Sequence, residues 1–222
     1  MNETGQEEQR NKNVSETKIF TVPFALEEIK KNINITTYSA SKLSKEEEIM
    51  SQAFKFHSEN NISEAAKYYQ YFINLEFSDH RVFSNLGTIL KDLGKLEEAE
   101  KLYRKAIKIN PHYAMAYSNL GNILRDLGNL KEAELSIRKA IELNPNFAKA
   151  HYNLGSILID LGKLKEAELS TRKAIELNPD YSKALSNLGS ILRNLGNLKE
   201  AEIYQLKAIE LNPTYAKSHS NL

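Results

Sequence analysis

The pattern of hydrophobic and polar positions repeats every 34 residues between residues 80 and 215. In one clear copy, Tyr117, Leu120, Gly121 and Leu124 fall on a single helical face. A second apolar pattern with helical spacing follows directly, from Leu130 to Leu143. Each repeat therefore predicts two helices joined by a short turn.

Glycine and proline mark the ends of these predicted helices. Gly121 lies inside the first helix, where glycine costs about 1 kcal/mol relative to alanine, so we expect a second helix to approach closely there. Gly128 follows the last apolar residue of that helix and is typical of a left-handed C-cap. The second helix should end near Asn144, because the residue before Pro145 is forced out of helical geometry.

These features divide the chain. Residues 1–45 are polar at their start, and we expect them to be largely disordered, with a short helix that can begin at Pro23. Ser44 and Glu47 then form the pattern of a capping box at a helix start. Five helical hairpins are predicted, at residues 46–79 (a degenerate copy), 80–113, 114–147, 148–181 and 182–215, and a further, truncated copy begins at 216–222. In the degenerate copy, Asn60 replaces the C-cap glycine.

Stacking is the way such hairpins bury their apolar surface. Each hairpin carries apolar residues on both sides, so a single hairpin leaves one side uncovered. The predicted fold is therefore all-α, an elongated α-solenoid of stacked helical hairpins.

Composition narrows the classes of function. The chain has 222 residues, a formal net charge of +1 and no cysteine, which excludes disulfides, thiol catalysis and cysteine-bound zinc. Its N-terminus does not have the pattern of a signal peptide, and no apolar run approaches the length of a membrane helix, about 18 residues. We expect a cytoplasmic protein that binds neither membrane nor nucleic acid. No group of residues has the pattern of a catalytic, metal or cofactor site, so we expect no enzyme activity in this chain.

The repeated residues resemble the tetratricopeptide repeat (TPR) family over residues 46–222. The resemblance implies a right-handed superhelix of stacked hairpins. The main departures are Thr171 and Gln205, which replace the aromatic residue found at Tyr103, and His151 and Leu185, which replace the one found at Tyr117; we expect weaker local packing at these places.

A row of asparagines carries a narrower resemblance. The same position in each first helix is occupied by Asn85, Asn119, Asn153 and Asn187. In the TPR arrays of O-linked N-acetylglucosamine transferases, which this chain resembles most, matching asparagines grip a peptide backbone. A primary amide suits that task, because it offers both a donor and an acceptor. The alternative is that the asparagines are ordinary solvated residues, copied whenever the repeat was duplicated.

Basic residues are expected on the same face as the asparagines. Lys149, Lys183 and Arg125, together with Arg81, Lys91 and Arg193, outnumber Asp92, Asp126 and Asp160 there. This predicts a partner with acidic residues or a free carboxylate, although an ordinary solvated face is an equal alternative. Lys149 and Asn153 also resemble part of the carboxylate clamp of chaperone-binding relatives, but Asn221 stands where that clamp has an arginine.

Three functions remain open from the sequence. The first is a protein-interaction module that binds an extended peptide in the groove of the superhelix. The second is the substrate-recruiting N-terminal array of a larger enzyme similar to a glycosyltransferase, whose catalytic domain is absent from this chain. The third is a scaffold that self-associates through its uncapped C-terminal end, because the sequence stops within the first helix of another repeat.

Overall fold

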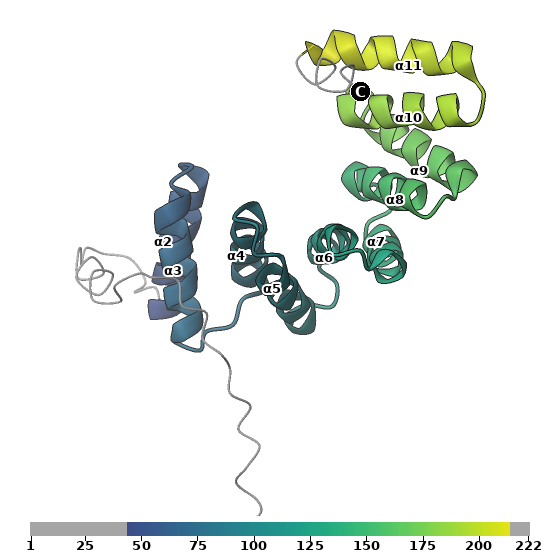
Figure 1. Cartoon of the computed structure of the whole chain (residues 1–222). Coiled ribbons are helices and arrows are strands. Elements are labelled where there is room, and N and C mark those ends of the chain that lie inside the picture. Colours follow the sequence, from purple (N-terminus) through teal and green to yellow (C-terminus); the bar gives the residue numbers. More distant parts are fainter. Residues whose placement is uncertain (1–43, 214–222) are drawn as a thin grey trace, which may run out of the picture. The chain divides into compact units, whose positions relative to one another are not determined.

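The computed structural model describes residues 44–213, which contain ten α-helices and no strand (Figure 1). The helix predicted at Pro23 and the truncated repeat at 216–222 lie outside the described residues. The helices are α2 (Lys45–Ser58), α3 (Ile62–Asn74), α4 (His80–Asp92), α5 (Leu96–Ile109), α6 (Ala114–Asp126), α7 (Leu130–Leu143), α8 (Ala148–Asp160), α9 (Leu164–Leu177), α10 (Ser182–Asn194) and α11 (Leu198–Leu211).

The helices form two compact units, and α2 and α3 are the helices that the structure describes in the first unit. Helix α2 begins with the predicted capping box: the backbone N–H of Ser44 donates to Glu47 Oε2 at 2.8 Å, and the backbone N–H of Glu47 donates to Ser44 Oγ at 3.3 Å. The turn between the helices contains Asn60 at φ 58°, which confirms a left-handed residue there. Tyr69 and Phe72 are fully buried in this hairpin.

The second unit contains the four regular hairpins, from α4 to α11. In each hairpin the two helices pack along each other, and the second helix then packs on the first helix of the next hairpin. The first helices α4, α6, α8 and α10 also contact one another in succession, whereas the second helices make no comparable contact within the described stack. We call these four helices the first-helix row, and α5, α7, α9 and α11 the second-helix row.

Both glycine predictions are confirmed in the second unit. A Cβ added to Gly121 would lie 2.6 Å from the side chain of Ile137, so α7 approaches α6 as closely as the mid-helix glycine allows. Gly128 has φ +81°, as a left-handed C-cap requires. Helix α7 ends at Leu143, and Asn144 is extended, at φ −141° and ψ 90°, ahead of its proline.

Candidate functional site

The predicted asparagines lie on the first-helix row, at the same point of α4, α6, α8 and α10. Two of them form hydrogen bonds to the preceding first helix. Asn153 Nδ2 donates to Ser118 Oγ at 3.2 Å, which joins α8 to α6. Asn187 Nδ2 donates to Ser156 Oγ at 2.9 Å, which joins α10 to α8. The asparagine row therefore helps to hold consecutive first helices together, a role that the sequence pattern did not reveal.

The asparagines differ in how much of each side chain reaches solvent. Asn153 is only 5% exposed, whereas Asn85, Asn119 and Asn187 are half-buried. A primary amide has two N–H donors and one oxygen acceptor, and the bond from Asn187 to serine uses one donor. Asn187 thus retains polar capacity toward a ligand, while Asn153 contributes mainly to the contact between helices.

Two exposed lysines accompany the row. Lys149 precedes Asn153 by four residues and Lys183 precedes Asn187 by four, so each pair lies on one face of its helix. Both lysines are exposed, and within residues 44–213 neither forms an ion pair. In α6 the matching position holds Met115, which is 48% exposed. At this helix position, the cations that form no ion pair within the described residues therefore lie on α8 and α10.

Arg125 is engaged in a contact between repeats. Its Nε donates to Asp160 Oδ2 at 2.5 Å, linking the end of α6 to the end of α8. This hydrogen bond raises the pKa of Arg125 above its usual value, and burial opposes the shift. Arg81 is also paired, within its own helix, because its Nη2 lies 2.8 Å from Oδ2 of the N-cap residue Asp79. The face is consequently less positive than the number of basic residues in the sequence suggested.

The described helices contain neither a cluster of potential metal ligands nor a membrane-spanning segment. Within residues 44–213 no group of three or more histidine, aspartate and glutamate side chains is arranged to hold a metal. Over the same residues, each helix is too short or too polar to cross a membrane. The chemistry of this face is that of amides and ammonium groups, which bind by hydrogen bonds and charge.

Sequence profiles identify the repeats. A profile described as TPR repeat matches residues 87–128, and profiles described as tetratricopeptide repeat match 114–147, 148–181 and 182–215. Together the matches span more than half of the chain. The chain belongs to the tetratricopeptide repeat family. The last three matches have the same bounds as the repeats that we predicted from the spacing of glycine and proline.

Solved structures with the same fold are also TPR proteins. MamA from Desulfovibrio magneticus RS-1, solved from residue 41 to its end, is 23% identical, with a TM-score of 0.67, over 78% of this TPR chain and 97% of the solved MamA chain. YrrB, described as a TPR protein with an unusual peptide-binding site, is 24% identical, with a TM-score of 0.62, over 79% of this chain and 91% of YrrB. At this level of identity the likeness establishes the TPR fold alone. No curated protein matches the sequence.

Proposed function

We propose that the first-helix row of this TPR array binds an extended peptide segment of a partner protein. The TPR fold is that of a protein-interaction scaffold. The observation that carries the finer proposal is the recurrence of a primary amide at one point of four successive first helices, with Lys149 and Lys183 exposed one turn away.

The chemistry of the row suits a peptide backbone. Each peptide unit presents one N–H and one C=O, and an amide side chain can pair with both. Asn119 and Asn187 would supply most of these contacts, since Asn153 is nearly buried. Regularly repeated amides select an extended backbone over any particular side chain, so sequence preference must come from other groups.

Charge supplies that preference. Lys149 and Lys183 favour acidic residues or a free carboxylate close to Asn153 and Asn187. Arg125 can contribute only if a ligand competes with Asp160 for its guanidinium. The proposed partner is therefore an extended, acidic segment that lies across α6, α8 and α10.

The test is a binding series with labelled, unstructured peptides, one set rich in glutamate and one neutral. Each lost hydrogen bond removes about 0.5–1.5 kcal/mol, so N119A/N187A should weaken binding of both sets about tenfold. The K149A/K183A variant should weaken only the acidic set, and less so at high salt. S118A is the matched control, because it removes the helix contact of Asn153 while leaving every asparagine in place. If a folded N119A/N187A variant binds both peptide sets as tightly as the wild type, the proposal is wrong.

Peptide recruitment could also serve a larger enzyme. As the substrate-recruiting array of a glycosyltransferase-like protein, the same row would hold the segment to be modified. The mass of the native protein from its source cells distinguishes the two settings, because a recruiting arm requires a catalytic domain in the same polypeptide.

Self-association is a second candidate, favoured by the surface of α11. Ile203, Leu206 and Leu211 are 52%, 59% and 45% exposed there, and a set of exposed apolar residues is typical of an interaction surface. Leu206 stands where earlier repeats have Arg104, Arg138 and Arg172. L206R therefore restores a residue that the fold already tolerates, and it should reduce any concentration-dependent oligomer seen by light scattering.

A further inference from the structure

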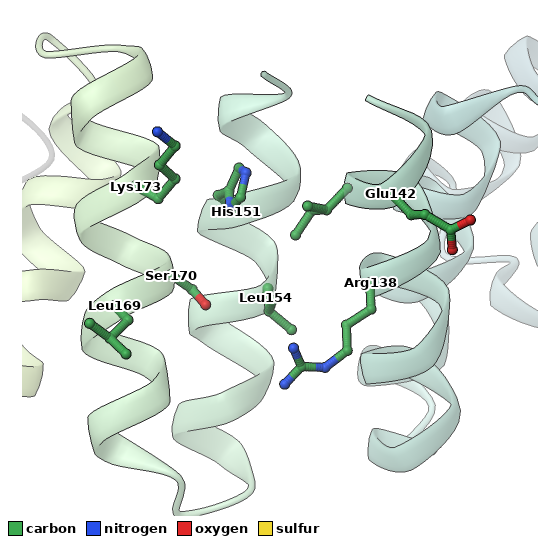
Figure 2. Close-up of a pocket in the computed structure, with 8 residues that line it drawn as sticks. Arg138, Glu142, His151, Leu154, Leu169, Ser170 and Lys173 are labelled. Carbon is green, nitrogen blue, oxygen red and sulfur yellow. The ribbon is translucent and has the colours of Figure 1, made fainter. Parts of the chain in front are cut away.

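Away from the asparagine row, the second-helix row contains a hollow between α7 and α9, with α8 as its floor (Figure 2). Its volume is about 470 Å³. Ile141 and Leu154 give it an apolar lining, and Arg138 and Ser170 lie at its sides. Leu169 stands at its edge with 70% of its surface exposed.

An equivalent hollow lies one repeat earlier, between α5 and α7 over α6. Its volume is about 450 Å³, and all of its lining residues except Glu132 stand 34 positions before those of the first hollow. Arg104, Ile107 and Leu120 replace Arg138, Ile141 and Leu154. Leu135 is 68% exposed at the edge, and Ser136 takes the place of Ser170. The same site therefore occurs twice in succession.

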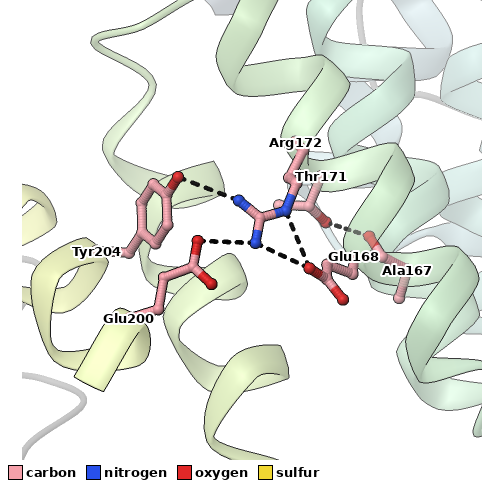
Figure 3. A network of polar contacts seen from close by, with 6 residues as sticks. All are labelled: Ala167, Glu168, Thr171, Arg172, Glu200 and Tyr204. Carbon is pink, nitrogen blue, oxygen red and sulfur yellow. Dashed lines mark hydrogen bonds and ion pairs between the residues drawn. The ribbon is translucent and has the colours of Figure 1, made fainter. Parts of the chain in front are cut away.

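One repeat later, the position of these serines is occupied by Tyr204 (Figure 3). Its ring packs with Ile175 against a buried cluster that contains Leu188. Arg172 Nη1 donates to the Tyr204 hydroxyl at 3.2 Å, and the guanidinium carbon lies 5.7 Å from the ring centroid. Leu188, Ile175 and Arg172 are the repeat equivalents of residues that line the two hollows.

Tyr204 thus shows which side chain this site accommodates. Serine is too short to reach the space that the tyrosine ring fills, so the repeats with Ser136 and Ser170 keep it open. In the first regular repeat the same position holds Leu102, which is 4% exposed. In the four regular repeats this position therefore holds leucine, serine, serine and tyrosine in turn, and the two hollows lie in the repeats that have serine.

The arginines beside the hollows are oriented as Arg172 is. Arg172 Nε and Nη2 bind Glu168, and Nη2 also binds Glu200, while Nη1 reaches the phenol. Arg138 likewise uses Nε and Nη2, for Glu134 and Glu166. Its Nη1 is therefore the group that matches the donor to Tyr204.

We infer that the hollows at Ser136 and Ser170 bind aromatic side chains of a partner protein, with tyrosine preferred. The ring would cover Leu135 or Leu169 and pack on the floor leucine, and its hydroxyl would accept from Nη1 of Arg104 or Arg138. A partner segment that carries two aromatic residues could fill both places at once. The hollows share no residue with the asparagine row, so this inference can be tested independently of the proposed peptide groove.

The probe is p-cresol, which is the tyrosine side chain cut at its Cβ, added to the isotope-labelled full chain and followed by amide chemical shifts. We expect saturable shifts around Ser136 and Ser170, and several-fold weaker binding of toluene, which lacks the hydroxyl. S136Y and S170Y should each abolish the shifts at their own hollow and preserve them at the other. Y204S should create a third binding site near Arg172.

Both filled variants introduce the tyrosine that the fold already accommodates at position 204, one repeat after position 170 and two repeats after position 136, so they should remain folded in a thermal melt. Absence of shifts at both hollows in the wild-type chain would overturn the inference, as would shifts that persist in S136Y/S170Y. Sedimentation equilibrium tests the occupant. If the wild-type chain forms an oligomer that S136Y/S170Y does not form, the occupant is a second copy of this chain and not a different protein.

Discussion

The side chain of Thr171 in α9 lies directly against the backbone of Gly155 in α8, in the space that a Cβ would need. Thr171 is fully buried, and its Oγ1 donates to the Ala167 carbonyl at 2.7 Å, which fixes its rotamer. This position in the second helix was expected to pack weakly because threonine replaces the tyrosine of the first regular repeat. The contact with glycine is nevertheless close.

The first prediction is that G155A destabilises the array. Alanine gains about 1 kcal/mol over glycine in a helix, but overpacking a core of this kind costs about 1–3 kcal/mol, and Thr171 cannot move without losing its bond to Ala167. The midpoint of urea unfolding, followed by circular dichroism, should fall. In G155A/T171A the overlap is removed, so the double variant should recover part of the loss. If the losses of stability in G155A and T171A simply add in the double variant, the close contact between these two residues is contradicted.

The second prediction concerns Glu76, just after α3, which has φ 61°. A left-handed backbone costs a residue with a Cβ about 1–2 kcal/mol, whereas glycine loses about 0.5–1 kcal/mol of conformational entropy relative to alanine. Glu76 is exposed, so removing its side chain sacrifices little else. E76G should raise the thermal midpoint, with a net gain of about 0.5–1 kcal/mol. E76A keeps the strain and is the control; equal stabilisation by both variants would refute the backbone explanation.

These positions show what the sequence could predict. Gly121, Gly128 and the Asn-Pro pairs each constrain the backbone locally, so a 34-residue period was enough to place the helix boundaries of the regular repeats. Capping by Ser44 and Glu47 was predictable for the same reason, since the two residues lie within one turn.

Contacts between repeats were harder to predict. Asn153 binds Ser118, which lies 35 positions before it. The same spacing would give Asn187 the residue at position 152 as its partner. Position 152 holds a tyrosine whose ring packs on Tyr181 at 5.0 Å, and the amide bonds Ser156 instead. Such a choice depends on side-chain packing between helices, which periodicity does not contain. The two hollows did have a signal, because the order leucine, serine, serine, tyrosine at one repeat position marks an unfilled space.

The third prediction concerns the pH dependence of stability through Glu134. Its Oε2 accepts from Lys163 Nζ at 2.9 Å and its Oε1 from Arg138 Nε at 2.9 Å. The hydrogen bond from Lys163, followed by that from Arg138, lowers the pKa of Glu134 in the folded state against the opposing effect of burial. The unfolded pKa of glutamate is about 4.3. The stabilisation is therefore fully present above that pH and is lost as pH falls through the folded pKa.

E134Q should consequently be less stable than wild type at pH 7, by about 0.5–1 kcal/mol, and the difference should shrink as the pH falls below about 4. Urea unfolding of both proteins across this range measures it. E142Q is the matched control, because within residues 44–213 Glu142 pairs only with Lys139, one turn away, and its side chain is 67% exposed. A difference for E134Q that stays constant with pH would exclude the carboxylate as its source.

The last prediction separates a structural asparagine from one merely copied with the repeat. If the bond from Asn187 to Ser156 holds α10 to α8, N187A and S156A should each cost about 1 kcal/mol, and N187A/S156A should cost little more than either alone. Chemical denaturation of the three variants gives the coupling energy. If Asn187 is only a solvated residue, the coupling energy should be zero and N187A should lose almost no free energy of unfolding. Because S156A leaves the amide in place, it should preserve peptide binding that N187A weakens, and this difference assigns the amide two roles, one toward the neighbouring helix and one toward the ligand.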